Sequence, residues 1–155
     1  MKVRSVAGAL AIVIGILGAF LSASTSAWAD DDSFRQEALA QINAFRAEQG
    51  RKPVILDAAL DGIASEWAAK LAREGELEHR SRGNLKSLLD AHGWTAMNEN
   101  LYMSSTPSAS PGEVIAAWKG SSGHRRNLLQ ENITRIGLGT ATGQAGFFVV
   151  FNGAG

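Results

Sequence analysis

Residues 133–152, ITRIGLGTATGQAGFFVVFN, contain two runs rich in residues that favour β-strands, ITRIGLGTAT and GFFVVFN. The tripeptide GQA separates them, and a short break of this kind between two such runs is typical of a β-hairpin. We therefore predict an antiparallel hairpin near the end of the chain. Because a lone hairpin leaves its apolar side chains in water, helices from elsewhere in the chain must cover it.

The segments that precede the hairpin predict these helices. In residues 34–50, FRQEALAQINAFRAEQG, apolar residues recur at helical spacing and Gly50 ends the run, which indicates a first helix. Asp57 can cap a second helix that ends before Gly75. The apolar face of this second helix includes Trp67, which we assign to the core because aromatic stripes of this kind are usually buried.

The middle of the chain adds two short elements and a further helix. Residues 85–93 form a short amphipathic segment, and residues 98–103, NENLYM, are predicted to form a short strand. Ser110, Pro111 and Glu113 suit the N-cap, N1 and N3 positions of another helix and together form a capping box, which gives Glu113 a structural role. The order of helices, strand, helix and hairpin predicts an α+β fold.

Residues 1–29 have the features of a secretory signal peptide. These features are a basic start at Lys2 and Arg4, an apolar stretch over residues 6–21 and the small-x-small site Ala27-Trp28-Ala29. We predict removal of residues 1–29, which leaves residues 30–155 as a single secreted domain, extracellular or periplasmic. The apolar stretch is shorter than the roughly 20 residues that a spanning helix requires, so we expect no membrane span after cleavage.

The composition of the predicted mature chain limits its functional classes. The chain has no cysteine, so its stability must come from packing and not from disulfides. Residues 1–29 contain two of the 15 basic residues and none of the 15 acidic ones, which leaves 13 basic against 15 acidic residues and a net charge of −2. This charge gives no basis for nucleic-acid binding, and we exclude nucleic acid as a partner.

Three residues in separate segments are candidates for one site: His79 after the second helix, Glu99 in the NEN strand and His124 in GHRRNLL. Separations of 20 and 25 residues do not bring them together locally, as the spacing of an H-E-x-x-H helix would. Ser121 and Ser122 beside His124 suggest a serine nucleophile, but neither lies in a G-x-S-x-G segment and no acid or oxyanion hole is indicated. We assign one of these serines to the cap of the short helix that follows.

Several segments together resemble the CAP superfamily, which includes cysteine-rich secretory proteins and plant pathogenesis-related proteins and is built on an SCP-like domain. They are QINAFRAEQG, VILDAALDGIASEWAAKLAREGELEHRS, NENLY, EVIAAWKGSSGHRRNLL, and IGLGTA followed by GFFVVF. The resemblance covers nearly the whole predicted mature chain and is strongest to the compact bacterial type.

The resemblance implies a three-layer α/β/α sandwich with a small antiparallel sheet covered by helices. It also implies a central cleft in which His79 is the histidine after the second helix, Glu99 the glutamate of the G-E-N motif and His124 the second histidine. Two imidazoles and one carboxylate are suitable ligands for Zn²⁺ or another divalent cation.

The sequence departs from the family pattern at two positions. Asn98 replaces the glycine of G-E-N, which suggests that the backbone there does not need a glycine-only conformation. Ser121, three residues after Trp118, stands where many eukaryotic members have a second cleft glutamate. The reduced ligand set of His79, Glu99 and His124 leaves at least one coordination position open, so we expect weak metal binding.

We therefore expect a secreted, monomeric binding module without enzymatic activity, whose extracellular ligand is a protein, a lipid or a cell-wall component. One alternative is a metal-dependent extracellular hydrolase, because an open coordination position permits catalysis. The other is a sterol- or lipid-binding protein, for which Phe34, Phe45 and the FFVVF run supply apolar surface, although we assign these residues to the core.

Overall fold

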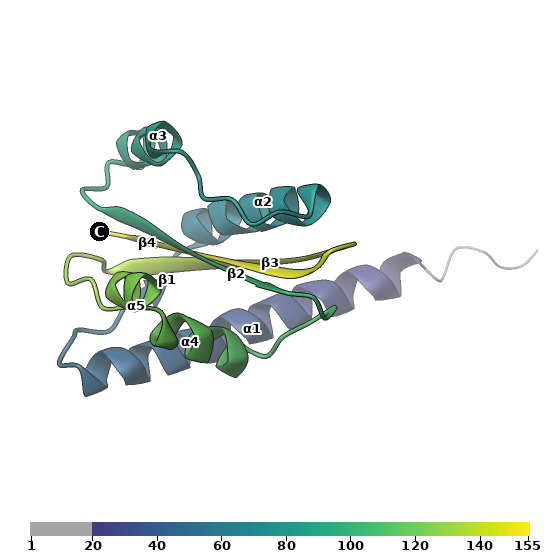
Figure 1. Cartoon of the computed structure of the whole chain (residues 1–155), viewed down its shortest axis with the longest axis horizontal. Helices are drawn as coiled ribbons and strands as arrows, with labels where there is room; N and C mark the ends of the chain where they lie inside the picture. Colours follow the sequence, from purple (N-terminus) through teal and green to yellow (C-terminus); the bar gives the residue numbers. More distant parts are fainter. Residues whose placement is uncertain (1–19) are drawn as a thin grey trace, which may run out of the picture.

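The computed structural model describes residues 20–155, with side chains from residue 31 onward. Five helices and a four-stranded sheet form three layers (Figure 1). In chain order the elements are α1 (Phe20–Glu48), β1 (Ile55–Leu56), α2 (Ala58–Glu74), α3 (Arg82–His92), β2 (Met97–Ser104), α4 (Pro111–Gly120), α5 (Ser122–Leu128), β3 (Arg135–Gly143) and β4 (Gly146–Ala154).

The first helix starts earlier than the sequence predicts. Most of the predicted signal peptide, residues 1–19, lies outside the described residues, and α1 runs without a break through the predicted cleavage site at residues 27–29. Cleavage at this site stays a prediction.

The hairpin predicted over residues 133–152 is confirmed, and it forms the centre of the sheet. The strand order is β1-β3-β4-β2, and β4 pairs antiparallel with both β3 and β2. The two-residue strand β1, which the sequence did not predict, pairs in parallel with β3 at the edge of the sheet. The sheet is therefore antiparallel apart from this one short pair.

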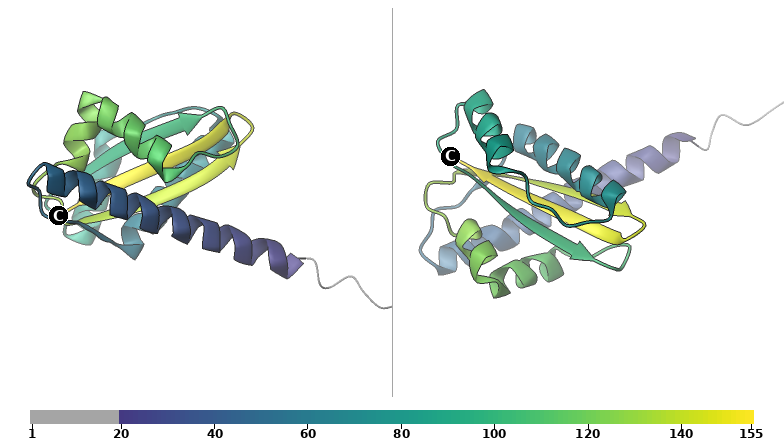
Figure 2. Two further views of the ribbon diagram at one scale, coloured as in Figure 1. Left: turned by 90° about the horizontal axis from the view of Figure 1, so that it is seen from below. Right: turned by 45° about the horizontal axis from the view of Figure 1, so that its top comes forward.

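Alternate residues of β4 belong to two separate cores. Phe147, Val149 and Phe151 pack with α1, α4 and α5, whereas Phe148 and Val150 pack with α2. Figures 1 and 2 show α1, α4 and α5 on one face of the sheet and α2 on the other. Because helices cover both faces, the predicted α/β/α sandwich is confirmed.

Helix α2 lies directly against the backbone of β3. A Cβ atom added to Gly137 would lie 2.1 Å from the carbonyl carbon of Leu60, and one added to Gly139 would lie 2.2 Å from the backbone nitrogen of Ser65. Real side chains do not approach a backbone this closely. The two glycines of the IGLG segment therefore allow the close approach of the helix.

The helix caps predicted for α2 and α4 are present. The side chain of Asp57 accepts hydrogen bonds from the first backbone N–H groups of α2, and Gly75 ends that helix with a φ of +73°. Ser110 and Glu113 form both halves of the capping box at the start of α4, as predicted. Glu113 therefore has a structural role in the fold.

Two predicted side-chain roles differ from the structure. Trp67 is only partly buried at the edge of the α2 core, where its indole Nε1 donates to the carbonyl of Glu78 at 3.0 Å. An indole at a core edge can satisfy its polar N–H while burying its ring, which favours this position. Ser121 occupies the N-cap position of α5, but its side chain makes no capping hydrogen bond.

We expect Gly139→Ala to lower the free energy of unfolding by about 3 kcal/mol or more, because the added methyl group would overlap the α2 backbone. Gly62→Ala is a matched control within α2, since a Cβ there has no atom within 4 Å. The control should raise the free energy of unfolding by about 1 kcal/mol through helix propensity. Urea denaturation measures both values, and equal stability of the two variants would contradict the close-packing account.

Candidate functional site

The side chain of Glu99 lies in the interior between β2 and the 75–81 connection and is only 2% exposed. Its Oε1 accepts a hydrogen bond from the backbone N–H of Arg80 at 3.1 Å and lies 2.9 Å from Nδ1 of His79. Its Oε2 lies 3.3 Å from Nε of Arg80 and accepts from Nδ2 of Asn152 at 3.5 Å. A buried carboxylate is costly unless it is paired and hydrogen-bonded, and these contacts supply both.

His79 connects this buried carboxylate to the surface. Its side chain is 59% exposed. The residue belongs to the connection between α2 and α3, which Figure 1 shows as a loop. A neutral imidazole beside a carboxylate carries its proton on the facing nitrogen, here Nδ1. The Nε2 atom then has a free lone pair available to a ligand.

Arg80 holds the connection against the sheet and against α2. The residue is 8% exposed, its guanidinium donates to the carbonyl of Ile63 in α2, and the same group lies 4.5 Å from the ring centre of Trp67. Burial lowers the pKa of Arg80, and the charge of Glu99 opposes this effect. Arginine stays charged in this setting, so it neutralises Glu99.

A chain of asparagine amides fixes α5 beside the same strand. Asn100 donates to the carbonyl of His124 at 3.0 Å, and Asn127 donates to the carbonyl of Glu99 at 3.0 Å and to Oδ1 of Asn100 at 2.8 Å. Asn98 donates in turn to the carbonyl of Asn127 at 3.1 Å. The position of His124 is therefore set by side chains of β2.

The two histidines are electrostatic neighbours. Burial lowers the pKa of His124, and positive charge on His79 lowers it further. Residues that are distant in the sequence, His79, Glu99 and His124, are thus brought to one region at the start of β2. Asn98 also has an ordinary extended strand conformation, in agreement with the expectation that glycine is not required there.

The structure gives no support to a serine nucleophile. Ser121 and Ser122 lie at the start of α5, and within residues 31–155 neither hydroxyl is hydrogen-bonded to the ring of His124. A triad requires a nucleophile within hydrogen-bond reach of its base.

Metal binding by His79, Glu99 and His124 stays a prediction. Among the described residues, no group of three or more His, Cys, Asp or Glu side chains has an arrangement that could hold a metal ion. Both oxygens of Glu99 already contact His79, Arg80 or Asn152. The donors that remain are two imidazoles, and the role of Glu99 as a direct ligand stays a prediction.

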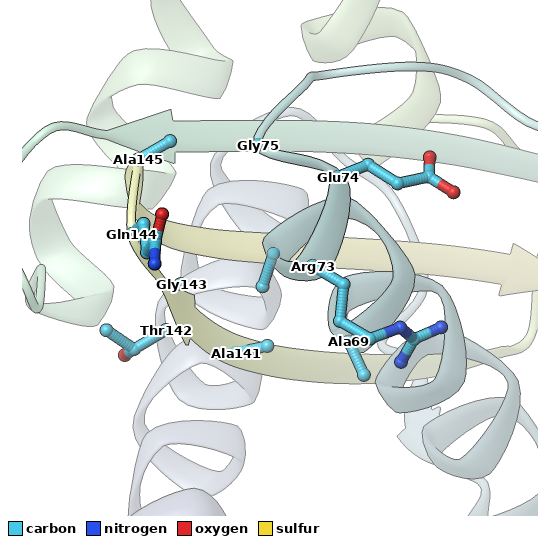
Figure 3. Close-up of a pocket in the computed structure, with 10 residues that line it drawn as sticks. Ala69, Arg73, Glu74, Gly75, Ala141, Thr142, Gly143, Gln144 and Ala145 are labelled. Atoms are coloured by element: carbon cyan, nitrogen blue, oxygen red, sulfur yellow. The ribbon is translucent and has the colours of Figure 1, made fainter.

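None of four hollows on the described surface is lined by His79, Glu99 or His124, although Asn127 lines one of them. Figure 3 shows one of about 670 Å³ between the end of α2 and the β3–β4 turn. Small residues such as Ala72 and Ala141 line much of it. The histidine cluster is therefore distinct from these hollows.

Sequence reasoning missed the residues that support the cluster, namely Arg80, Asn100, Asn127 and Asn152. Asparagine is depleted in strands, so the asparagines in NENLYM and at the end of GFFVVFN were a usable signal of buried polar contacts. Arg80 gave no such signal, because HRSRGN has the composition of a solvated loop.

Residues 39–152 match the family described as CAP, the cysteine-rich secretory protein family. The chain belongs to the CAP family. A curated relative, the uncharacterized protein YkwD of Bacillus subtilis (strain 168), is 29% identical over 120 residues. That alignment covers 75% of this chain and 46% of YkwD, so this CAP chain spans about half the length of that relative.

Solved structures show the same CAP fold. An outer surface protein from Borrelia burgdorferi superimposes with a TM-score of 0.68 at 18% identity, over 79% of this chain and 92% of that one. An extracellular protein containing an SCP domain from Bacillus anthracis str. Ames gives a TM-score of 0.64 at 20% identity, over 80% and 41% of the two chains. These structures confirm the predicted fold, and the match over residues 39–152 confirms the predicted family.

The lowered pKa of His124 predicts a pH-dependent stability. The unfolded chain takes up this proton near the ordinary value of 6.5, whereas the folded chain takes it up only at lower pH. Above pH 6.5, His124 is neutral in both states and does not lower the free energy of unfolding. As the pH falls below 6.5, protonation of His124 favours the unfolded chain, and the free energy of unfolding decreases.

The urea midpoint of the wild-type protein should fall between about pH 7.5 and pH 5. We expect this fall to be smaller in His124→Gln and unchanged in His92→Gln, whose histidine is exposed on α3. Identical pH profiles for wild type and His124→Gln would show that His124 is not desolvated by the fold.

Proposed function

We propose that the mature chain is a secreted, monomeric CAP binding module whose two imidazoles weakly hold a divalent cation, with Zn²⁺ the best match to nitrogen donors. The observation that carries this proposal is the 2.9 Å contact between Nδ1 of His79 and Oε1 of Glu99. Metal-ligating histidines commonly donate their second ring N–H to a carboxylate, which orients the ring and raises its basicity. Glu99 is suited to this supporting role.

The electrostatics of His124 are also compatible with metal binding. Its lowered pKa keeps the imidazole neutral at pH 7, and only the neutral ring coordinates a metal. A bound cation would supply positive charge and open coordination positions for water or an oxygen of the ligand. Within the cluster, His79 and His124 would bind the cation, while Glu99 and Arg80 would hold His79 in place.

Secretion is supported by the sequence and by the CAP relatives. Residues 1–29 have the signal-peptide pattern, and two structural neighbours are described as an outer surface protein and an extracellular protein. Within residues 20–155, no helix has the length and apolar character needed to cross a membrane.

The geometry favours a binding module over the two alternatives. A hydrolase needs a substrate pocket beside its catalytic groups, and none of the four hollows described above is lined by His79, Glu99 or His124. A lipid carrier would need apolar surface, but Phe45 and the FFVVF run are buried in the two cores. Phe34 is only partly buried, and it packs edge-on against Phe147.

For the metal prediction, we expect Zn²⁺ at a hundred times its dissociation constant to stabilise the mature protein by about 2.7 kcal/mol. For a domain of this size, that corresponds to a rise in melting temperature of the order of 10 °C. His79→Ala and His124→Ala should each remove most of the rise, and the double variant should lose little more because one ion couples both ligands. His92→Ala, on the exposed face of α3, is the matched control.

The supporting role of Glu99 has its own test. Glu99→Gln should weaken Zn²⁺ binding by about 10- to 100-fold without abolishing it, because the ring of His79 loses its orienting charge while both imidazoles remain. Calorimetric titration measures this affinity, and circular dichroism checks that the variant is folded. Complete loss of binding in folded Glu99→Gln would instead make Glu99 a direct ligand, and an equal Zn²⁺ effect in all histidine variants would place the ion elsewhere.

A further inference from the structure

A second candidate site lies where α5 and the residues that follow it meet the segment after α1. It is a hollow of about 710 Å³, within the range of small-ligand sites. Its charged lining residues are Arg51, Arg125, Arg126 and Glu131. None of the three metal-site candidates lines it, although Asn127, which donates to the carbonyl of Glu99, does.

Positive charge dominates this hollow. Arg51 is paired with Glu131, whereas Arg125 and Arg126 have no acidic partner within the described part of the chain. The guanidinium of Arg125 lies 5.3 Å from the ring centre of Phe45, which supports it from one side. Three arginines and one glutamate therefore line the hollow.

A buried arginine behind the hollow adds to this charge. Arg46 is 1% exposed and donates to the carbonyls of Lys52 and Leu128 at 2.8 and 2.7 Å, without an acidic partner among the described residues. Burial lowers the pKa of Arg46, and the charge of Arg51 lowers it further. In addition, Nε of Arg51 is buried and has no hydrogen-bond partner.

We propose that this arginine hollow binds a phosphate group of an extracellular ligand. Guanidinium groups bind oxyanions through paired N–H donors, and a tetrahedral phosphate offers enough oxygens to contact Arg51, Arg125 and Arg126 together. A carboxylate has only two oxygens and would leave one of these arginines without a contact. Phosphate is therefore the better match to a hollow that three arginines line.

Glu131 acts in this site as an internal competitor. Its carboxylate forms an ion pair with Arg51. The side chains of Arg51 and Glu131 are 36% and 74% exposed, so an incoming anion can replace the carboxylate at Arg51. A smaller hollow of about 330 Å³ shares Arg51 and Glu131 and adds Lys52. A ligand with a second anionic group can thus extend past Arg51 toward Lys52.

The test is a titration of the ¹⁵N-labelled mature protein with inorganic phosphate, followed by NMR. We expect saturable shifts at the backbone amides of residues 125–127. The double variant Arg125→Gln/Arg126→Gln should weaken binding by at least tenfold, since each lost contact is a hydrogen bond between charged groups. Glu131→Gln should strengthen binding several-fold because it frees Arg51 and removes a negative charge.

Arg82→Gln, an exposed arginine of α3, is the control for a general loss of positive charge and should leave phosphate binding unchanged. Arg126→Gln alone keeps the contact between Arg125 and Phe45 and tests the site if the double variant does not fold. Equal binding in wild type and in folded Arg126→Gln, or weaker binding in Glu131→Gln, would overturn the proposal.

Two further probes identify the source of the phosphate. Glycerol 3-phosphate represents a soluble ligand, and vesicles of phosphatidylglycerol mixed with phosphatidylcholine represent a lipid surface. NMR shifts that appear with either probe and are lost in Arg126→Gln would support phosphate binding in the hollow. The probe that causes them would identify the source of the phosphate. Vesicle binding that does not depend on Arg126, without any shift from phosphate, would show a diffuse surface attraction and overturn the proposal.

Discussion

The arrangement of the candidate site depends on one buried charge, the carboxylate of Glu99. A carboxylate in the interior must be paired and fully hydrogen-bonded, and no single element of this fold could satisfy it. Its partners come from the connection after α2, through His79 and Arg80, and from β4, through Asn152. Satisfying Glu99 therefore fixes the position of an otherwise exposed loop and sets one histidine at the surface in a defined orientation.

The close contact of α2 with β3 makes this arrangement possible. Gly137 and Gly139 let the helix lie on the strand backbone, so the connection that follows the helix lies close to the sheet. Arg80 then links both elements, since it donates to the carbonyl of Ile63 in α2 and pairs with Glu99 in β2. The hollow lined by Arg51, Arg125 and Arg126 also uses α5, so one short helix contributes to both proposed sites.

The sequence predicted those elements that their own residues specify. It did not predict contacts between residues that are distant in the chain. Periodic apolar residues, the Ser110 capping box and the GFFVVFN run each specify an element through its own residues, and these elements are confirmed. The glycines of IGLG were assigned to a strand, but their packing role depends on a helix about 70 residues earlier in the chain. His79, Glu99 and His124 came from a family resemblance, whereas Arg80 and the asparagines that support them are defined only by contacts between distant segments.

The most direct test of this account is the protonation state of His79, measured by ¹⁵N NMR of the histidine side chains above pH 7. The account predicts that neutral His79 carries its proton on Nδ1 and leaves Nε2 unprotonated, while His92 shows the mixture of tautomers of an exposed histidine. Glu99→Gln should shift His79 toward the same mixture. A proton on Nε2 of His79 in the wild-type protein would contradict the claim that Glu99 orients this ring toward a ligand.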